Sequence, residues 1–230
     1  MDQSQTMVAG EMQRFEPTAR TRLRRRPGRG SYEPAVVHAI LDEGLVCHVG
    51  FTDAHGPVVL PTAYARDGDA ILLHGAPASR LMQHAGRPLC LTVTLVDGLV
   101  LARSAMHHSM NYRCVMVFGC GEIVTEPEAK RAALARVLEQ LVPGRAAHTR
   151  APDDAELAAT AVLRLPLVEV SAKIRSGGPL DDAADLALAH WAGELPLALL
   201  ATPPAGAPEH VRAWHRGAPA RSNLRARSDP

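Results

Sequence analysis

Three short apolar runs, separated by tight polar turns, occupy residues 45–74. The first run, 45–51, alternates apolar and other residues with the period of a strand that buries one face. Asp53-Ala54-His55-Gly56 and Asp67-Gly68-Asp69 interrupt the pattern, and glycine at such turns can adopt the positive φ that hairpins need. The spacing therefore predicts strands over 45–51, 57–65 and 70–74, joined as an antiparallel meander.

Further strands are expected over 89–96, 113–125 and 162–174, where apolar residues again dominate. Asp97-Gly98 is expected to form a turn that leads into the run 99–103, and Gly119 and Gly121 favour a bulge or a barrel corner. Short strands in hairpins, with helices at the periphery, are typical of a small antiparallel β-barrel. The fold class is therefore mainly β, with about six strands.

Apolar residues at helical spacing predict helices over 33–43, 128–142 and 153–160. Pro34 suits the first turn of the first helix, and Asp153 suits the N-cap of the third. The second helix is expected to bury an apolar stripe, made of Leu134, Val137, Leu138 and Leu141. A shorter helix is expected after Gly75, ending near Gly86.

The composition allows one domain with a core of small aliphatic side chains. The chain has 230 residues, of which 47% are hydrophobic but only 3% aromatic. The net charge of +1 provides no overall field for nucleic acid, so such a partner is not expected. A run of arginines within 20–29 could contact phosphates, but a solvated arm is the more frequent structure for such a run.

Residues 1–30 are expected to form a flexible basic arm, 31–200 the domain, and 201–230 a mobile tail rich in Pro, Ala and Arg. The most apolar late stretch, 186–201, is interrupted by polar residues and proline and is short for a bilayer span of about 20 residues. Residues 1–13 lack the apolar core of a secretion signal. A cytoplasmic protein without a membrane partner is therefore expected.

The four cysteines, Cys47, Cys90, Cys114 and Cys120, show no C-x-x-C spacing. Each lies in an apolar, strand-like run, so we expect buried free thiols in a reducing compartment. Zinc sites need closer pairs of ligands, so no metal site is expected.

The loop between 102 and 113 carries an unusual density of polar groups for a connection between two strands. It holds His107, His108, Asn111 and Tyr112, together with two serines and two arginines. Ordinary connections are short and rich in Gly, Asn, Asp and Pro, whereas loops on a rigid scaffold often bind ligands. The two histidines are adjacent, so on a strand they would point to opposite faces and could not easily bind one metal. The alternative to a functional role is that one of the two histidines is buried and hydrogen-bonded and the other is exposed.

A second cluster combines His74-Gly75 with Ser79-Arg80. A helix that begins there would direct backbone N–H groups at an anion, Ser79 would add a donor, and Arg80 would add a planar cation suited to phosphate. The alternative is a surface helix whose arginine is solvated. The glycine-rich patterns of Rossmann and P-loop proteins are absent, so a nucleotide here would need another fold.

The order of these motifs resembles one family. The motifs are His48-Val49-Gly50-Phe51, Leu60-Pro61-Thr62, Leu73-His74-Gly75 with Ser79-Arg80, the run 96–104, His107-His108-Ser109-Met110-Asn111-Tyr112-Arg113, the run 171–175 and the run 191–197. Together they resemble the FMN-binding split barrel of pyridoxamine 5'-phosphate oxidase-like proteins, in the branch that includes Nim-type nitroimidazole-resistance proteins. The resemblance covers about residues 22–197.

The resemblance implies a homodimer with two flavin sites at the subunit interface. It places Ser79 and Arg80 at the FMN phosphate, and His74 and Gly75 beside the ring and the ribityl chain. The backbone of Leu60, Pro61, Thr62 and Ala63 would follow the isoalloxazine edge. The remaining residues would approach the site in part from the second subunit, with the tryptophan against the ring: Ser104, His107, His108, Asn111, Tyr112 and Trp191. No clear match exists to the residues that hold pyridoxal phosphate, so vitamin B6 oxidation is not expected.

Three functions follow as hypotheses. The first is an FMN-dependent oxidoreductase acting on a small molecule such as a nitro-aromatic compound, with His74 as catalytic donor or proton relay. The second is a haem-binding or haem-handling protein in which His74, His107 or His108 is the axial ligand. The third is a flavin-binding carrier or sensor without turnover.

Overall fold

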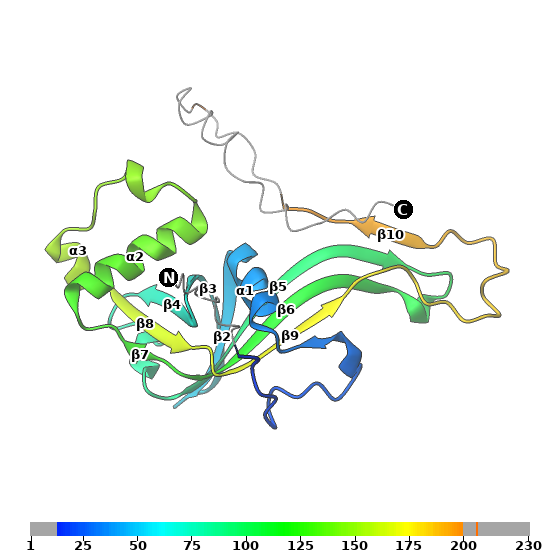
Figure 1. Cartoon of the computed structure of the whole chain (residues 1–230), viewed down its shortest axis with the longest axis horizontal. Coiled ribbons are helices and arrows are strands. Elements are labelled where there is room, and N and C mark those ends of the chain that lie inside the picture. The colour runs from blue at the N-terminus through cyan, green and yellow to red at the C-terminus, as the bar shows by residue number, and fades with distance from the viewer. Residues whose placement is uncertain (1–12, 200–205, 207–230) are drawn as a thin grey trace, which may run out of the picture.

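The computed structural model describes residues 13–199 and residue 206. One curled antiparallel sheet forms a half-barrel, in the strand order β1-β9-β6-β5-β2-β3-β4-β8-β7, and β10 pairs with β5 beside this path (Figure 1). The fold class predicted from the sequence is confirmed. The strands are β1 (Gly30–Ser31), β2 (Val46–Asp53), β3 (Gly56–Asp67), β4 (Ala70–Gly75), β5 (Pro88–Leu101), β6 (Ser109–Cys120), β7 (Glu122–Ile123), β8 (Ala161–Pro166), β9 (Glu169–Arg175) and β10 (Gly193–Pro196).

The predicted meander is confirmed. Asp53 pairs with Gly56, and Asp67 with Ala70, so both hairpins are tight. Gly56 has a φ of 111° and Gly68 a φ of 55°, which are the positive values that such turns require. Strand β3 serves both halves of the sheet, because it pairs with β2 up to Ala63 and with β4 from Tyr64 onward.

The core fills the inside of this curl with aliphatic side chains from β2, β4, β5, β6, β8 and β9. Helix α1 (Pro34–Glu43) closes it with Val37, Ile40 and Leu41. The buried Tyr64 donates a 2.6 Å hydrogen bond to the Leu41 carbonyl, which ties β3 to the end of α1.

Helix α2 (Pro127–Leu141) lies on β3 at the far side of the sheet from the long β5–β6 ribbon, with the short α3 (Asp154–Ala159) beside it (Figure 1). The predicted capping of α3 by Asp153 is confirmed, since Glu156 and Asp153 form a reciprocal capping box. The predicted stripe of α2 is partly wrong. Ala133, Val137 and Gln140 are its buried residues, and Leu141 is exposed. The Gln140 amide donates to the carbonyls of Leu41, Asp42 and Gly44, so a polar contact replaces an apolar one.

Several predicted boundaries are corrected. Strand β5 runs without a turn through Asp97-Gly98, which form a bulge against β6. The predicted strand 113–125 begins earlier and is broken at Gly121, between β6 and β7. The predicted strand 162–174 is two strands, β8 and β9, that separate at Leu167-Val168. The helix expected after Gly75 is a turn followed by a single 3-10 turn, Met82–His84.

All four cysteines are free, as expected, but they are not equally buried. Cys47 is fully buried, and burial raises the pKa of its thiol to about 12. Cys90 and Cys114 are half-buried, whereas Cys120 is exposed, so the expectation of four buried thiols is corrected for it.

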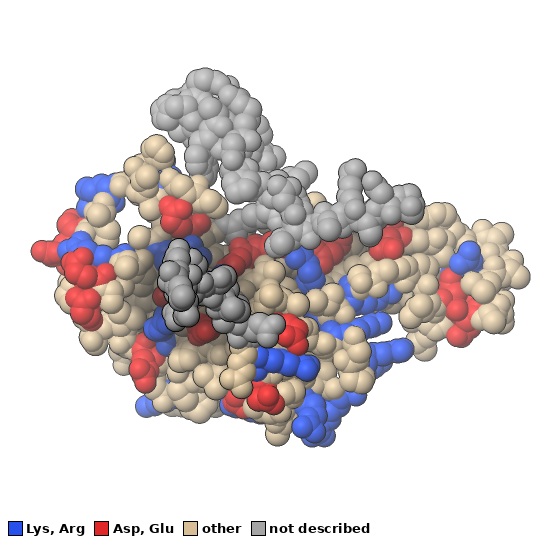
Figure 2. Space-filling model, viewed as in Figure 1, with Lys and Arg blue, Asp and Glu red and all other residues tan. Residues whose placement is uncertain are grey.

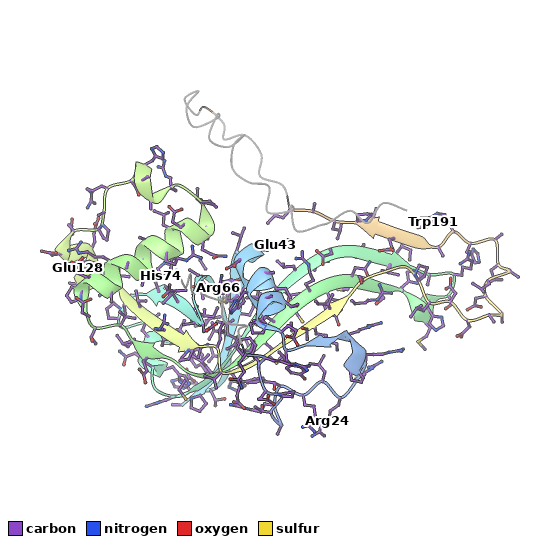
Figure 3. The ribbon with its side chains drawn as sticks, viewed as in Figure 1. Arg24, Glu43, Arg66, His74, Glu128 and Trp191 are labelled. Atoms are coloured by element: carbon purple, nitrogen blue, oxygen red, sulfur yellow. The ribbon has the colours of Figure 1, made fainter. Side chains whose placement is uncertain are left out.

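The N-terminal segment from residue 13 contacts the barrel before β1 pairs with β9. The Tyr32 hydroxyl donates to the Thr21 carbonyl, and Arg20 lies over the Phe118 ring at 4.9 Å while pairing with Glu169. Arg22, Arg24, Arg25 and Arg26 are exposed, and positive side chains gather at this lower edge (Figures 2 and 3). Residues 1–12 of the arm expected over 1–30, and the tail expected over 201–230 apart from residue 206, lie outside the described residues, and the domain boundaries stay a prediction.

Within the described residues, no helix is both long and apolar enough to cross a membrane. The apolar stretch that begins at Leu186 contains instead the short strand β10.

A pH dependence of stability follows from His38 on α1, which is buried near the turn between β3 and β4. Desolvation, assisted by the charge of Arg66, lowers the pKa of His38 below its ordinary value, although Asp69 lies 3.1 Å away and acts in the opposite direction. The unfolded chain therefore binds the proton more readily, so the free energy of unfolding should fall as the pH drops below about 6.5. Urea denaturation at pH 7 and pH 5 tests this. A His38→Gln variant should lose part of the slope, and an unchanged slope would contradict the assignment.

Candidate functional site

His74 lies near the end of β4, opposite Val162 on β8, and is half-buried. Its Nδ1 atom is buried and has no hydrogen-bond partner among the described residues. Leaving such a polar atom unsatisfied costs about 1–3 kcal/mol, so buried polar atoms normally have a partner. The arrangement therefore fits a group that binds here and supplies the partner.

The turn after β4 places two further predicted residues, Gly75 and Ser79, against each other beside His74 in the chain. A Cβ added at Gly75 would lie 3.4 Å from the Ser79 hydroxyl, so Ser79 lies within van der Waals distance of this glycine. The Ser79 hydroxyl accepts a 3.4 Å hydrogen bond from the backbone of Met82. The predicted helix N-terminus is wrong, because only a 3-10 turn of three residues follows. Anion binding here would depend on the side chains of Ser79 and Arg80 and on the turn itself.

Arg80 is held by a carboxylate that the sequence analysis did not include. Its Nε donates a 2.9 Å hydrogen bond to Asp53 Oδ2, and a terminal nitrogen donates to the same oxygen. The Arg80 hydrogen bonds lower the pKa of Asp53 below its ordinary value, assisted by the backbone N–H of His55. An anion that binds Arg80 must therefore compete with Asp53. The signal in the sequence was present, but Asp53 was assigned only to a hairpin turn.

The middle of β3 lies beside this cluster. Leu60, Pro61, Thr62 and Ala63 pair with β2 along their whole length. The ladder between β3 and β4 ends at Tyr64 and Leu73, so Ala63 and His74 are the next residues on the two strands. We call the group formed by 60–63, His74, Gly75, Ser79 and Arg80 the barrel cluster.

The other predicted residues lie at the opposite end of the molecule, at the tip of the β5–β6 ribbon. Ser104, His107, His108, Asn111, Tyr112 and Trp191 form this tip cluster, and Figure 3 shows Trp191 far from His74. The Ser104 hydroxyl lies 3.0 Å from Nδ1 of His107, and the Ser104 carbonyl lies 2.9 Å from Nδ1 of His108. His107 is half-buried and His108 is exposed. Within one chain, the predicted site residues therefore lie in two separate groups, the barrel cluster and the tip cluster.

Asn111 anchors the tip cluster through two residues that the sequence analysis left without a role. It accepts a hydrogen bond from the buried Arg175 and donates one to Glu194 on β10. Arg175 also donates to the carbonyls of Gly177 and Gly178. Burial, and then the charge of Arg29, lower the pKa of Arg175. Both residues lie in runs that carried the resemblance, which was the available signal.

Carboxylates also reach the tip from a distant segment. His107, Asp182 and Asp185 place possible ligand atoms within 4.8 Å of one another, and Asp182 is exposed. The loop 102–113 contains no acidic residue of its own, and these acids come from the segment before β10.

The profile described as pyridoxamine 5'-phosphate oxidase matches residues 33–174, which is more than half of the chain. The chain belongs to this family. Its curled sheet is the flavin-binding barrel of pyridoxamine 5'-phosphate oxidase-like proteins. No match is found among curated proteins.

Two of the similar solved structures are more than 30% identical to this chain over the aligned residues. The flavocytochrome Anf3 from Azotobacter vinelandii is 38% identical, and the match covers 84% of this chain and 91% of that one, with a TM-score of 0.79. The FAD and haem binding protein from Mycobacterium smegmatis is 34% identical over 79% of this chain and 90% of that one, with a TM-score of 0.74. A 5-nitroimidazole antibiotic resistance protein from Bacteroides thetaiotaomicron, described as putative, is 23% identical over 63% of this chain and 86% of that one, with a TM-score of 0.54, and shows a similar fold.

Proposed function

We propose that this chain is a flavin-dependent oxidoreductase that also holds a haem. The observation that carries the flavin assignment is the buried, unpartnered Nδ1 of His74 beside Ser79 and Arg80. The haem is supported by the two relatives above 30% identity, both of which are named for a haem or cytochrome together with a flavin. Redox chemistry is the function that a flavin and a haem have in common.

The barrel cluster suits a flavin. Arg80 and the Ser79 hydroxyl would hold a phosphate, and the tight turn at Gly75 would let the backbone approach the ligand. A bound flavin supplies two-electron chemistry, which can also be passed on in single electrons. FMN is the form expected from the resemblance, and FAD is the form in the name of the Mycobacterium relative. Mass spectrometry of the released cofactor distinguishes them.

His74 would donate or accept a proton at the reacting centre. An imidazole ring has nitrogen atoms that can donate or accept, so it can serve in either direction. The neighbouring backbone of β3 would orient the ring, since its course is fixed by pairing with β2.

The site is proposed to need two chains. The tip cluster lies far from His74 within one chain, and the resemblance implies that the two meet across a homodimer. Three of the exposed apolar side chains on the β2–β3–β5 face, Val46, Val59 and Val96, suit such a contact. A stable interface of this kind usually buries more than about 2,000 Å².

The first experiment measures the cofactors of the purified protein. We expect flavin absorbance and a Soret band in one preparation, with near-stoichiometric flavin and haem per chain after extraction. Turnover should be seen with a reduced nicotinamide as donor and oxygen or a nitro-aromatic compound as acceptor. Flavin binding without turnover would favour the carrier hypothesis, and the absence of flavin after reconstitution would reject the proposal.

The second experiment tests the shared site by co-expressing two defective chains. A chain with Arg80→Ala and a chain with His107→Ala and His108→Ala should each be impaired as homodimers. If the site combines the barrel cluster of one chain with the tip cluster of the other, a mixed dimer regains one intact site. Failure of the mixed dimer to regain activity, or a flavin-loaded monomer in light scattering, would contradict the two-chain site.

Arg80→Ala should weaken flavin binding roughly tenfold to a hundredfold, because a charge-assisted hydrogen bond contributes about 1.5–3 kcal/mol. The loss should be large for FMN or FAD and small for riboflavin, which lacks the phosphate. Arg164→Ala is the matched control, since Arg164 also pairs with an aspartate, Asp67, at the surface. Equal losses for riboflavin and FMN would show that Arg80 does not hold the phosphate.

A further inference from the structure

The segment from residue 13 to residue 33 concentrates positive charge at one edge of the molecule. It carries seven arginines and two glutamates, whereas the whole chain has a net charge of only +1, so the rest of the chain is net negative. Figure 2 shows positive side chains gathered at this lower edge. Such a separation of charge creates a field that orients an approaching charged partner, even when the net charge is small.

Two arginines of the segment are neutralised within the chain, and the others are not. Arg14 lies 3.1 Å from a carboxylate oxygen of Glu33, and Arg20 pairs with Glu169. Among the residues that the structure describes, no carboxylate forms an ion pair with an arginine of residues 22–29, which we call the arginine loop. The arginines of this loop are Arg22, Arg24, Arg25, Arg26 and Arg29. Their guanidinium groups are therefore free to bind an external anionic surface.

The arginine loop is held against the barrel at both of its ends. The Tyr32 hydroxyl donates a 3.0 Å hydrogen bond to the carbonyl of the buried Thr21 and accepts a 3.2 Å hydrogen bond from the Leu23 backbone. At the other end, Gly30 pairs with Lys173 on β9, so the loop joins the sheet directly. Because both ends are fixed, the positive charges keep a defined arrangement relative to the barrel.

Arg26 has a backbone conformation that its side chain disfavours. Its φ of 56° and ψ of 59° are left-handed, and it is the only non-glycine residue with a positive φ among the residues described. Glycine adopts this conformation readily, whereas a Cβ atom makes it unfavourable. The loop therefore keeps a charged side chain here at a cost to the fold. Backbone strain of this kind is frequent where a residue has a binding role.

The arginine loop is connected to the tip cluster through Arg175. Burial, and after it the charge of Arg29, lowers the pKa of Arg175, so these two guanidinium groups lie near each other. Arg175 in turn donates to Asn111 of the tip cluster. In the proposed two-chain site, the tip cluster meets the barrel cluster of the partner chain. A molecule docked on the arginine loop would therefore lie near that flavin site.

We propose that the arginine loop is the docking surface for a small acidic protein that donates electrons to the flavin. The inference rests on the proposed function, which requires a source of electrons. Complexes between electron-transfer proteins bury small interfaces and depend on complementary charge, which a compact basic loop can supply. Each docked donor is oxidised by one electron, so two successive donors supply the two electrons of a full flavin reduction, and water supplies the protons.

Nucleic acid and anionic membranes fit the arginine loop less well. Residues 22–29 contain no aromatic side chain, whereas proteins that bind single strands stack bases on aromatic rings. A segment that lies in a membrane interface inserts apolar side chains, but Leu23 is half-buried against the rest of the protein. A DNA duplex and phosphatidylserine vesicles therefore serve as competing probes in the test.

The test measures reduction of the flavin by an acidic plant-type iron–sulfur ferredoxin, with dithionite as a small reductant that needs no docking surface. We expect the ferredoxin rate to fall about tenfold between low salt and about 0.5 M salt, because salt screens the steering charges. Arg24→Ala together with Arg25→Ala should lower the low-salt rate severalfold and reduce its salt dependence. Fluorescence anisotropy of labelled, oxidised ferredoxin should show weaker binding to the flavin-free variant than to the flavin-free wild type.

Arg87→Ala together with Arg145→Ala is the matched control. Both arginines are exposed and form no ion pair with the residues that the structure describes, so the same charge is removed elsewhere and the ferredoxin rate should not change. Arg26→Gly is a further variant of the loop. It should slow the ferredoxin reaction while the urea midpoint stays at or above the wild-type value, since glycine relieves the left-handed backbone.

Three results would overturn the proposal and leave the proposed function intact. The first is a wild type that dithionite reduces but ferredoxin does not, or reduces at a rate independent of salt. The second is an equal ferredoxin rate in the arginine-loop variant and the control variant. The third is binding of the DNA duplex or the vesicles that depends on Arg24 and Arg25, with no effect of these residues on ferredoxin. A wild type that holds no flavin, or whose flavin dithionite does not reduce, would instead reject the proposed function.

Discussion

His74→Gln should lower turnover by a factor of about 10²–10⁴ while the protein keeps its flavin. Glutamine retains hydrogen-bonding capacity but cannot be protonated near neutral pH, so the variant removes proton transfer and leaves binding in place. General acid–base catalysis typically contributes a factor of that size. Single-turnover kinetics with a reduced donor, at several pH values, measure the effect.

Two controls separate this role from simple positioning. His148→Gln changes an exposed histidine in the turn beyond α2 and should not alter turnover. His107→Ala and His108→Ala should act unequally, because His107 is half-buried against the Ser104 hydroxyl whereas His108 is exposed. Near-normal turnover in His74→Gln would remove the proton role and leave His74 as a residue that only positions the ligand.

Arg113→Met should lower the free energy of unfolding by about 3 kcal/mol, a factor of more than 100 in the folding equilibrium. Arg113 binds Glu43 from α1 and Asp97 from the β5 bulge, and all three side chains are no more than 21% exposed. The hydrogen bonds of Glu43, and then of Asp97, raise the pKa of Arg113 above its ordinary value. Without the arginine, two carboxylates remain beside each other with their shared cation removed. Urea denaturation at pH 7 measures the loss.

Arg164→Met is the control for this second prediction. Arg164 pairs with one aspartate, and both side chains are about half exposed, so the change should cost at most about 1 kcal/mol. Adding Glu43→Gln and Asp97→Asn to Arg113→Met should recover part of the loss, because no uncompensated charge then remains. If Arg113→Met unfolds at the same urea concentration as the wild type, the network is not a stabilising one.

Local signals in the sequence were sufficient where the structure is itself local. Alternation and turn residues predict the β2–β3–β4 meander, whose strands pair with their immediate neighbours in the chain. The capping residue and helical spacing predict α3 and α1 for the same reason. These elements depend on contacts over a few residues, which a short window of sequence contains.

The sequence was misleading where a distant segment decides the local structure. Asp97-Gly98 has the composition of a turn, yet β5 continues through it because β6 and β10 pair with it from both sides. A Cβ at Gly98 would lie 2.9 Å from the Leu195 carbonyl. The glycine is therefore required for the close approach of β10, almost a hundred residues later in the chain, and no local rule could indicate this.

The candidate site shows the same division. His74, Gly75, Ser79 and Arg80 were grouped from neighbouring motifs, but the ion pair between Arg80 and Asp53 was missed, since Asp53 lies in a separate segment at the end of β2. The tip cluster was named as part of one site, and its distance from His74 becomes visible only in the structure (Figure 3). The sequence indicates candidate residues for the site, whereas the topology determines which of them lie close together within one chain.

The attachment of β10 has a consequence for how long a ligand stays bound. Four backbone pairs hold this strand to β5, and the described segment between β9 and β10 contains neither helix nor strand. Such an element can detach at a small fraction of the free energy needed to unfold the barrel. Its amides should lose protection from hydrogen exchange before those of β5 and β6. A ligand held at the tip cluster, where Asn111 donates to Glu194 on this strand, would then have a residence time set by this one short strand and not by the stability of the protein as a whole.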